Sequence, residues 1–318
     1  MCILWLCGIF SFKTEFMKKY ITSLVLFLAL LQFAFAQNKT VVFQSDFGLK
    51  DGAVSAMKGV AIAVSPDLKL FDLTHEIPAY NIWEAAYRLE QTVMYWPAGT
   101  VFVSVVDPGV GTNRRSVVLK TKSGHFIVTP DNGTLTLVSE SLGIEAVREI
   151  DEAVNRRKGS EKSYTFHGRD VYAYTAARLA AGVISFDQVG KALPNEVVKI
   201  PYQKAVLESN KIKGTISILD VQYGNIWTNI PADLFNQLQV KLGGKLHVVI
   251  YQGKIRKYEG DMPYTETFGA VAQGKPLAYL NSLLQLSFAL NMGNFSAAHK
   301  VYSGNNWTVE ITKTASGN

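Results

Sequence analysis

Short apolar runs alternate with segments of helical periodicity between residues 40 and 195, and this alternation limits the fold more than any other feature of the chain. Such a pattern is typical of a mainly parallel sheet with helices on its faces. Pro66 and Pro97 end two of the helical segments, and Gly182 follows the third. We therefore predict an N-terminal α/β domain over residues 40–195. Its expected strands are 41–45, 68–74, 101–106, 116–120 and 125–129, and its expected helices are 51–64, 81–95 and 169–181.

The chain beyond Pro194 is richer in strand-forming residues. Few helical patterns occur there, and apolar and β-branched residues gather in short runs. We predict a smaller C-terminal β domain over residues 205–312, joined to the first by a linker at 194–204. The expected strands are 215–220, 246–251, 254–260 and 307–312.

Composition bounds the number of domains and the kind of partner. The 318 residues are enough for two hydrophobic cores, and 48% of them are hydrophobic. Only 18% are charged, and the formal net charge is +6. No run of Lys and Arg and no stretch of interleaved basic and aromatic residues occurs in the sequence. We therefore expect no nucleic-acid partner.

The N-terminal segment has the pattern of a secretory signal peptide. Lys18 and Lys19 follow Met17 and precede a short apolar stretch, and an Ala-Phe-Ala sequence ends at Ala36. The apolar stretch is short for a membrane span, so an uncleaved anchor helix is the alternative. We predict a signal peptide at 17–36, export to the periplasm, and no membrane contact after cleavage. Residues 1–16 are interpreted as a misread upstream start.

Both cysteines, Cys2 and Cys7, precede the predicted signal peptide. The exported chain would then contain no cysteine, which excludes disulfides, thiolate metal sites and a Cys nucleophile. No cysteine stands at the predicted cleavage point either, so a lipid anchor is not expected there.

Polar side chains follow the predicted strands of the N-terminal domain. Ligands of open α/β sheets bind beyond the carboxyl ends of parallel strands, so these residues are candidates for one site. His167 lies in an HGRD motif that opens a predicted helix, where the helix dipole favours anions and a neutral imidazole. A polar motif at 220–229, DVQYGNIWTN, follows a strand of the C-terminal domain. The strand-end residues are Asp46, Asp72, Thr74, His75, Asp107, Asp131 and Asn132.

Each of these residues alone has a structural explanation, because Asp before Gly or Pro commonly makes turn hydrogen bonds. Together they leave three kinds of site open. Asp and His could bind a divalent metal for hydrolysis, although no HxH, HExxH or Asp-x-Asp pattern is present. A Ser–His–Asp hydrolase lacks its G-x-S-x-G signature. The third is a metal-free nucleoside site, in which carboxylates hold ribose hydroxyls and aromatic rings cover a base.

Seven motifs in one order resemble a single enzyme family. The chain resembles the S-adenosyl-L-methionine (SAM) hydroxide adenosyltransferases in these motifs. The resemblance extends from about Val41 to Met292. The enzymes of this family are adenosine-forming hydrolases related to the fluorinating and chlorinating enzymes. The resemblance implies an N-terminal α/β domain, a C-terminal β-barrel-like domain, and a homotrimer with sites between neighbouring subunits. The motifs are SDFGLKDG, DLTHEIP, VDPGVGTNRR, TPDNGTLT, TFHGRD, YGNIWTNI and YLNS.

The resemblance also implies the roles of individual residues. The family's catalytic set falls on Asp107, Arg114 and His167. Leu283 stands where halogenating relatives carry an arginine, which is a departure from the family pattern. The implied substrate contacts are Asp46 at the ribose hydroxyls, Asp51 with the backbone near Ala53 at the amino-acid end, Tyr80 over the ribose, Asp220 at the methionine portion, Asn225 and the Met292 backbone at adenine, Phe268 stacked on the base, and Ser282 at the carboxylate.

The implied reaction is hydrolysis of SAM to adenosine and methionine, by in-line attack of water on the ribose C5′ carbon and without a metal or other cofactor. Methionine leaves as a neutral thioether, so its departure needs no general acid. We expect Asp107 and His167 to orient and deprotonate the water, and Arg114 to keep Asp107 ionised. An exported, non-catalytic binder of adenosine or a related nucleoside is the main alternative, and a metal-dependent hydrolase is a weaker one.

Overall fold

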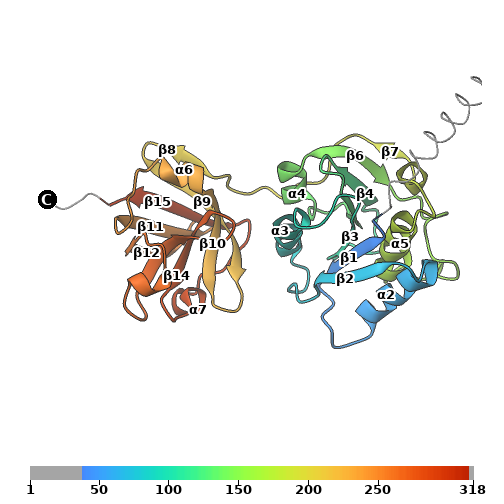
Figure 1. Ribbon diagram of the computed structural model, residues 1–318, viewed down its shortest axis with the longest axis horizontal. Helices are drawn as coiled ribbons and strands as arrows, with labels where there is room; N and C mark the ends of the chain where they lie inside the picture. The colour runs from blue at the N-terminus through green and yellow to red at the C-terminus, as the bar shows by residue number, and fades with distance from the viewer. Residues whose placement is uncertain (1–37, 315–318) are drawn as a thin grey trace, which may run out of the picture. The chain divides into compact units, whose positions relative to one another are not determined.

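The computed structural model describes residues 38–314. The predictions for residues 1–16 and for a signal peptide at 17–36 fall outside these residues. Within them, seven strands form an N-terminal sheet in the order β2-β1-β3-β5-β4-β6-β7 (Figure 1). The strands are β1 (Thr40–Ser45), β2 (Lys69–Thr74), β3 (Val101–Val105), β4 (Ser116–Thr121), β5 (Phe126–Pro130), β6 (Ile144–Glu149) and β7 (Ala192–Leu193).

The parallel part of this sheet contains the strands whose ends were predicted to form a site. β1 pairs in parallel with β2 and β3, and β3 pairs in parallel with β5. β4, β6 and β7 extend the sheet in antiparallel pairing. Because β2, β1, β3 and β5 run in one direction, Asp46, Asp107 and Asp131 follow strands that end at the same edge. The predicted α/β class is confirmed.

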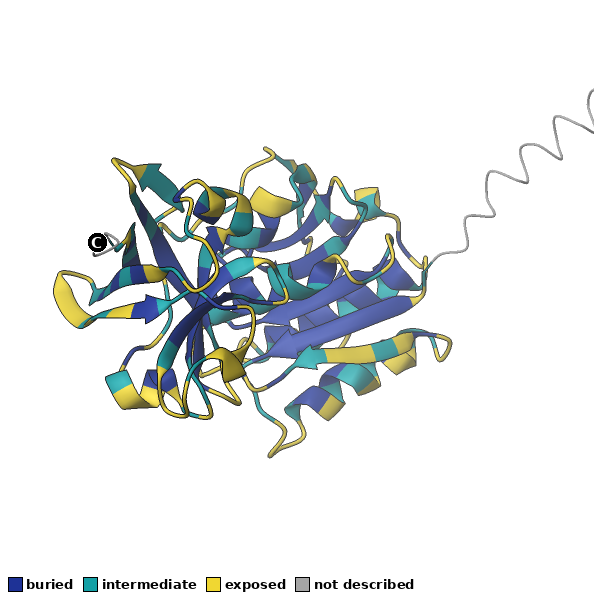
Figure 2. Ribbon diagram, turned by 60° about the vertical axis from the view of Figure 1, so that its left-hand side comes forward, coloured by how far each residue is buried: buried dark blue, intermediate teal, exposed yellow. Residues whose placement is uncertain are grey.

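Helices cover both faces of the sheet (Figure 1). Val41 and Phe43 of β1 pack with α2, η1 and α5, whereas Val42 between them packs with α3 and α4, because successive strand side chains point to opposite faces. The central strands are consequently buried on both sides (Figure 2). The helices are α2 (Ala53–Val64), α3 (Ile82–Val93), α4 (Thr136–Ser141), the π-helical turn η1 (Gly168–Ala173), α5 (Tyr174–Ala180) and the 3₁₀ turn η2 (Phe186–Val189).

The helix starts follow from local side-chain bonds. Asn81 caps α3 by accepting a hydrogen bond of 3.0 Å from the backbone N–H of Glu84. Asp51 accepts a bond of 2.9 Å from the N–H of Ala53, so the residues before Ala53 form a turn rather than the first turn of α2. The helix predicted over 169–181 is divided into η1 and α5.

The second sheet is antiparallel throughout and has the order β12-β11-β15-β9-β10-β14-β13, with β8 paired to β9. A bridge between Tyr264 and Ala278 joins the two ends of this order, so the sheet is nearly closed and barrel-like, as predicted. Its elements are β8 (Val206–Glu208), β9 (Lys211–Asp220), β10 (Asn225–Pro231), α6 (Ala232–Asn236), β11 (Lys245–Gln252), β12 (Ile255–Pro263), η3 (Phe268–Ala270), β13 (Pro276–Leu280), β14 (Gln285–Leu290), α7 (Phe295–His299) and β15 (Trp307–Lys313).

The connector between β7 and β8 is hydrogen-bonded on both flanks. On one side, the Val198 N–H donates to Asp131 Oδ1 at 2.8 Å. On the other, the Gln203 carbonyl accepts bonds from Thr215 Oγ1 at 2.8 Å and Asn229 Nδ2 at 2.9 Å. The segment predicted as a linker is therefore held by partners in both sheets.

Two predictions concern the organisation of the chain. The sheets divide near the predicted linker at 194–204, but the extents of the two domains, 40–195 and 205–312, stay predictions. Within residues 38–314, no helix is both long enough and apolar enough to cross a membrane.

Candidate active site

A cavity of about 230 Å³ opens at the carboxyl edge of the parallel strands. It lies between the loops that follow β1 and β3 and the start of η1. Four residues that the sequence predicted as one site line it, namely Asp46, Tyr80, Asp107 and His167. Apolar side chains, including Phe47, Val105 and Phe166, form much of the remaining wall.

Asp107 and Arg114 form a close ion pair beside this cavity. Arg114 Nε lies 3.0 Å from both carboxylate oxygens, and its Nη2 lies 2.6 Å from Oδ2. Burial opposes the charge of Arg114, but its hydrogen bond to Asp107 and the nearby Tyr172 raise the pKa of the guanidinium. Since Arg114 stays charged, it is a permanent positive neighbour of Asp107.

His167 lies between two arginines. Arg114 Nη2 is 2.7 Å from its Nδ1, and Arg156 Nη2 is 2.9 Å from its Nε2. Burial is the largest cause that lowers the pKa of His167, and both guanidinium groups lower it further, whereas Glu152 and Asp107 act in the opposite direction. The imidazole is therefore neutral at neutral pH.

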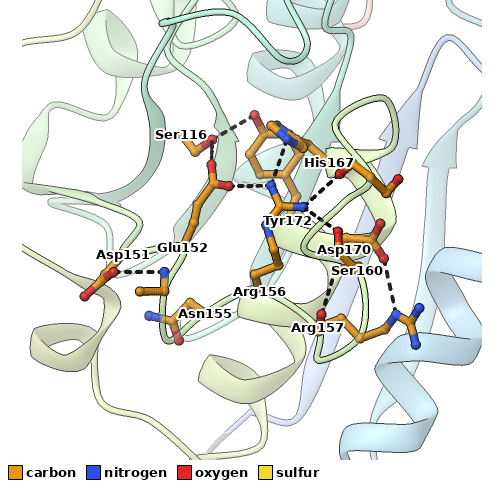
Figure 3. A network of polar contacts seen from close by, with 12 residues as sticks. Ser116, Asp151, Glu152, Asn155, Arg156, Arg157, Ser160, His167, Asp170 and Tyr172 are labelled. Atoms are coloured by element: carbon orange, nitrogen blue, oxygen red, sulfur yellow. Dashed lines mark hydrogen bonds and ion pairs between the residues drawn. The ribbon is translucent and has the colours of Figure 1, made fainter.

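Further polar contacts join these groups to the protein interior, as Figure 3 shows in part. Tyr172, fully buried in η1, reaches Asp107 Oδ2 at 3.4 Å and Ser116 Oγ at 3.2 Å. Ser116 also accepts a 2.9 Å bond from Arg114 Nη1. Arg156 Nη2 bonds Glu152 Oε2 at 2.5 Å (Figure 3). Each charged group of the cluster has fixed partners, which is the condition for a preorganised site.

Two glycines allow the backbone to approach closely here. A Cβ atom at Gly168 would lie 3.2 Å from Val105 Cγ1 and 3.3 Å from the Phe47 ring, so a larger residue next to His167 would require these neighbours to shift. Gly111, in the loop that carries Arg114, has φ of +77°, and a Cβ there would lie 2.9 Å from the Tyr164 carbonyl. Both glycines fix the distance between the catalytic candidates and their neighbours.

Asp46 faces the backbone of Tyr80. Its Oδ2 accepts a bond of 2.8 Å from the Tyr80 N–H, and Tyr80 has φ of +68°, which is rare for a residue with a side chain. The Tyr80 side chain remains 72% exposed beside the cavity. Asp51 does not line the cavity; it is exposed in the turn before α2, with its carboxylate bonded to the Ala53 N–H.

A second cavity, of about 750 Å³, lies in the C-terminal sheet. All five substrate contacts predicted in this part of the chain line it: Asp220, Asn225, Phe268, Ser282 and Met292. Trp227 and Tyr279 line it as well; both lie in quoted motifs, YGNIWTNI and YLNS, but neither was predicted as a substrate contact.

The second cavity combines aromatic surface with a polar end. The rings of Phe268 and Tyr279 are 4.9 Å apart, and Trp227 Nε1 donates to the Tyr279 hydroxyl at 3.2 Å. At the polar end, Asn225 Nδ2 donates to Asp220 Oδ2 at 3.2 Å. Flat apolar walls with a few directed polar groups suit a planar heterocycle.

A tight turn presents Ser282 to this cavity. Asn281 Oδ1 accepts hydrogen bonds from the N–H groups of Leu283 and Gln285, at 2.9 and 3.0 Å, which fixes the turn. Asn281 and Ser282 line the cavity, whereas the Leu283 side chain does not. No cationic side chain stands among the described residues that line this cavity.

Other strand-end residues have structural partners. Ser45 Oγ, His75 Nδ1, His75 Nε2 and Asp72 Oδ1 form a chain with contacts of 2.7 and 3.0 Å. This is the order of a Ser–His–Asp triad, but Ser45 is fully buried and cannot reach a substrate. Asp131 is paired with Arg115 and held by the connector. The structural explanation of these residues is therefore the better one.

Sequence reasoning missed the charged residues behind His167. Glu152 and Arg156 lie in a loop after β6 whose sequence, DEAVNRRKG, resembles an ordinary solvated charge cluster. Only their arrangement in space distinguishes Arg156, which contacts His167, from its neighbour Arg157, which binds Asp170. In the described part of the chain, no group of three or more His, Cys, Asp and Glu side chains is arranged to hold a metal ion.

Comparison with known proteins agrees with this geometry. Residues 41–190 match the SAM hydroxide adenosyltransferase N-terminal domain, and residues 214–308 match the C-terminal domain of the same family. The chain belongs to this family. The resemblance drawn from the motifs is thereby confirmed.

Named relatives of this adenosyltransferase-family chain include hydrolases and halogenating enzymes. The (R)-S-adenosyl-L-methionine hydrolase of Salinispora tropica is 35% identical over 259 residues, which cover 81% of this chain and 92% of the relative. That of Methanocaldococcus jannaschii is 40% identical over 197 residues, covering 61% and 67%. A fluorinase of Actinopolyspora mzabensis is 27% identical over 299 residues, covering 86% and 97%.

The family member also has a close match among solved structures. The crystal structure of a conserved protein of Thermotoga maritima aligns with a TM-score of 0.77 at 35% identity. The alignment covers 86% of this chain and all of the other. The similarity therefore extends over both sheets and the connector.

Proposed function

We propose that this protein hydrolyses (R)-S-adenosyl-L-methionine to adenosine and L-methionine. The observation that carries the proposal is the cluster of Asp107, Arg114 and His167 at the edge of one cavity, in a chain whose relatives are named (R)-S-adenosyl-L-methionine hydrolases. Water supplies the new C5′–O bond, the C5′–S bond breaks with its electron pair staying on sulfur, and one proton is released. No metal or cofactor enters this reaction.

Position and charge explain how the residues would act. The substrate is a sulfonium cation, so attack by water made partly anionic disperses charge in the transition state. An apolar wall that excludes other waters favours such a step and aligns the attacking oxygen with C5′. Phe47, Val105 and Phe166 supply that wall beside Asp107.

We assign proton acceptance to Asp107. Both ring nitrogens of His167 lie within 2.9 Å of guanidinium nitrogens, so both already have a polar neighbour in the protein. Each carboxylate oxygen, by contrast, has more than one lone pair and can accept from water while bonded to Arg114. His167 would then orient Arg114 rather than take the proton.

The two cavities support a composite site. Asp107 and His167 line one of them and the predicted adenine and methionine contacts line the other. No residue is shared by the two linings. A substrate with a reacting ribose and a long amino-acid arm needs both. We propose that neighbouring subunits of a homotrimer bring the two surfaces together.

Export by the predicted signal peptide is part of the proposal. It places the enzyme where SAM arrives only after leaving a cell, so a related extracellular nucleoside sulfonium is the substrate to test alongside it. The predicted adenine and ribose contacts are compatible with either compound.

The test is incubation of the purified protein with (R)-SAM and, separately, its (S)-sulfonium epimer, with and without EDTA. We expect adenosine and methionine in equal amounts, faster from the (R) epimer and unchanged by EDTA. Asp107→Asn should reduce turnover by about 10²-fold or more, because it removes the general base. Asp67→Asn is the matched control, because Asp67 is an exposed carboxylate between α2 and β2 that does not line the cavity.

Three outcomes would contradict the proposal. If neither epimer yields adenosine, the proposed hydrolysis is refuted. Unchanged turnover of Asp107→Asn would refute the role of Asp107. Loss of activity with EDTA would refute the metal-independent mechanism.

A further inference from the structure

The Arg156 side chain is fixed in the protein by contacts that do not involve substrate. Only 9% of the side chain is exposed. Its Nη2 bonds Glu152 Oε2 at 2.5 Å, and its Nη1 donates to the Ser163 carbonyl at 3.0 Å and the Ser160 carbonyl at 3.4 Å. The Tyr164 ring lies against the guanidinium, 5.9 Å from its central carbon. Arg156 therefore presents a nitrogen to His167 from a rigid position (Figure 3).

The imidazole of His167 has too few lone pairs for both of its neighbours. A guanidinium only donates hydrogen bonds, and a neutral imidazole has one accepting nitrogen. Arg114 at Nδ1 and Arg156 at Nε2 therefore compete for a single lone pair. A protonated ring would direct an N–H at a cation on each side. The two guanidinium groups therefore act in the same direction as burial, and Glu152 and Asp107 act against them.

We propose that Arg156, held by Glu152, is a positioning residue that keeps His167 neutral and fixes its ring against Arg114. The proposal rests on the proposed hydrolysis for its consequence, because a protonated His167 would repel Arg114 from Asp107. It does not require His167 to accept the proton from water. Glu152 and Arg156 carry opposite charges and therefore have opposite effects on the protonation of the His167 imidazole.

The charges around His167 come from several elements. Asp107 follows β3, Arg114 precedes β4, and Glu152 and Arg156 follow β6. The phenol of Tyr172, in η1, faces the cluster through Asp107. The two carboxylates favour the protonated ring and the two guanidinium groups oppose it. Removing Arg156 and removing the charge of Glu152 must therefore change the protonation of His167 in opposite directions.

The experiment measures protonation and activity separately. NMR titration of the five histidines, with that of His167 assigned through His167→Gln, follows the ring directly. The dependence of kcat/KM on pH follows its effect on turnover. In Arg156→Gln, His167 should titrate at higher pH and the acid limb of kcat/KM should move up by roughly one pH unit. In Glu152→Gln, which can still accept from Arg156, both should move to lower pH.

Two controls separate charge from structure. Arg156→Lys keeps the positive charge, so it should leave the acid limb close to that of the parent even if turnover falls. Arg157→Gln removes a positive charge from the next residue, whose guanidinium contacts Asp170 and not His167. It should shift neither the NMR titration nor the acid limb.

Opposite shifts in the two variants would support the proposal. Shifts in the same direction, no shift, or an equal shift in Arg157→Gln would overturn it. If the protein forms no adenosine at any pH, the proposed function fails, but the NMR titration still decides the role of Arg156. A variant that loses its folded spectrum is replaced by Arg156→Met, which keeps the length of the side chain without its charge.

Discussion

In the N-terminal cavity, Asp107 and His167 share one charged neighbour, Arg114. Arg114 bonds Asp107 and His167 through the same Nη2 atom, so the positions of the carboxylate and the imidazole are coupled. In the C-terminal cavity, single side chains act more independently. Phe268 is 42% exposed and contacts mainly Tyr279, so its loss should change ligand contact more than folding.

Phe268→Ala should weaken adenosine binding by about 0.5–1.5 kcal/mol, the contribution of one aromatic stacking contact. Isothermal titration calorimetry with adenosine measures the change. Tyr302→Ala serves as the control, because Tyr302 is an exposed aromatic residue that packs on Trp307 outside both cavities. Equal affinity of Phe268→Ala and the parent protein would argue against stacking of the base at this position.

The functional role of a single residue could be predicted only where the residue belongs to a recognisable sequence motif. Asp107, Arg114 and His167 belong to continuous motifs that follow strands or open a helix, and the structure brings all three together. Glu152 and Arg156 lie in a loop whose composition has no distinguishing pattern. Their approach to His167 depends on the packing of that loop, which no local sequence signal specifies.

At the scale of elements, the turn from β-sheet edge to helix positions His167. The π-helical turn η1 begins directly after it, and π-helical turns are frequent at functional sites. Gly168 lets this turn lie against Phe47 and Val105, both of which line the cavity. The geometry of the site is thus set by how closely one element packs on another.

Gly168→Ala should reduce turnover at least about tenfold while leaving the protein folded, because the added methyl group displaces the turn that carries His167. Gly59→Ala is the control: this glycine is exposed in α2 with no atom near its absent Cβ. That substitution should stabilise the protein by roughly 0.5–1 kcal/mol, since alanine has the higher helix propensity. Turnover and chemical denaturation measure the two effects. Full activity of Gly168→Ala would show that the close packing is not needed.

Elements with strong periodicity were predictable and elements without it were not. The five strands and three helices expected before residue 195 are all present, with ends shifted by a few residues. In the C-terminal sheet, β8, β10, β13 and β14 were not predicted. The apolar stretch around β14 has no clear alternation, so it does not distinguish a strand from a buried helix.

For the molecule as a whole, buried histidines determine the response to acid. Burial lowers the pKa of His75, His167 and His299. In the unfolded chain these residues titrate near about pH 6.5. Below that pH the unfolded chain binds more protons than the folded one, so the free energy of unfolding falls as the pH falls.

The thermal midpoint should therefore decrease between pH 7.5 and pH 5, the range in which these histidines gain protons in the unfolded chain. Thermal unfolding followed by circular dichroism at a series of pH values tests this. His75→Gln removes one of the three groups and should make the dependence on pH shallower, whatever its effect at pH 7.5. A midpoint that does not change over this range would contradict the assignment of neutral buried histidines.

The proposed trimer predicts complementation between inactive chains. Asp107→Asn damages one cavity and Phe268→Arg the other, so each variant alone should be nearly inactive. In a trimer assembled from a 1:1 mixture, about a quarter of the composite sites would combine two intact surfaces. Co-expression of the two variants, followed by an adenosine assay, should recover activity of that order. If no activity is recovered, the whole site lies within one chain.

The connector between the two sheets also bears on how this protein changes in length over evolution. Val198 is bonded to Asp131, which is only 5% exposed, and Gln203 is bonded by two residues of the second sheet. Adding or deleting one residue between Val198 and Gln203 would move the Val198 N–H away from the buried Asp131 carboxylate. Insertions and deletions should therefore accumulate at sites such as the exposed hairpin tip at Gly253, where a fluorescent tag could also be placed.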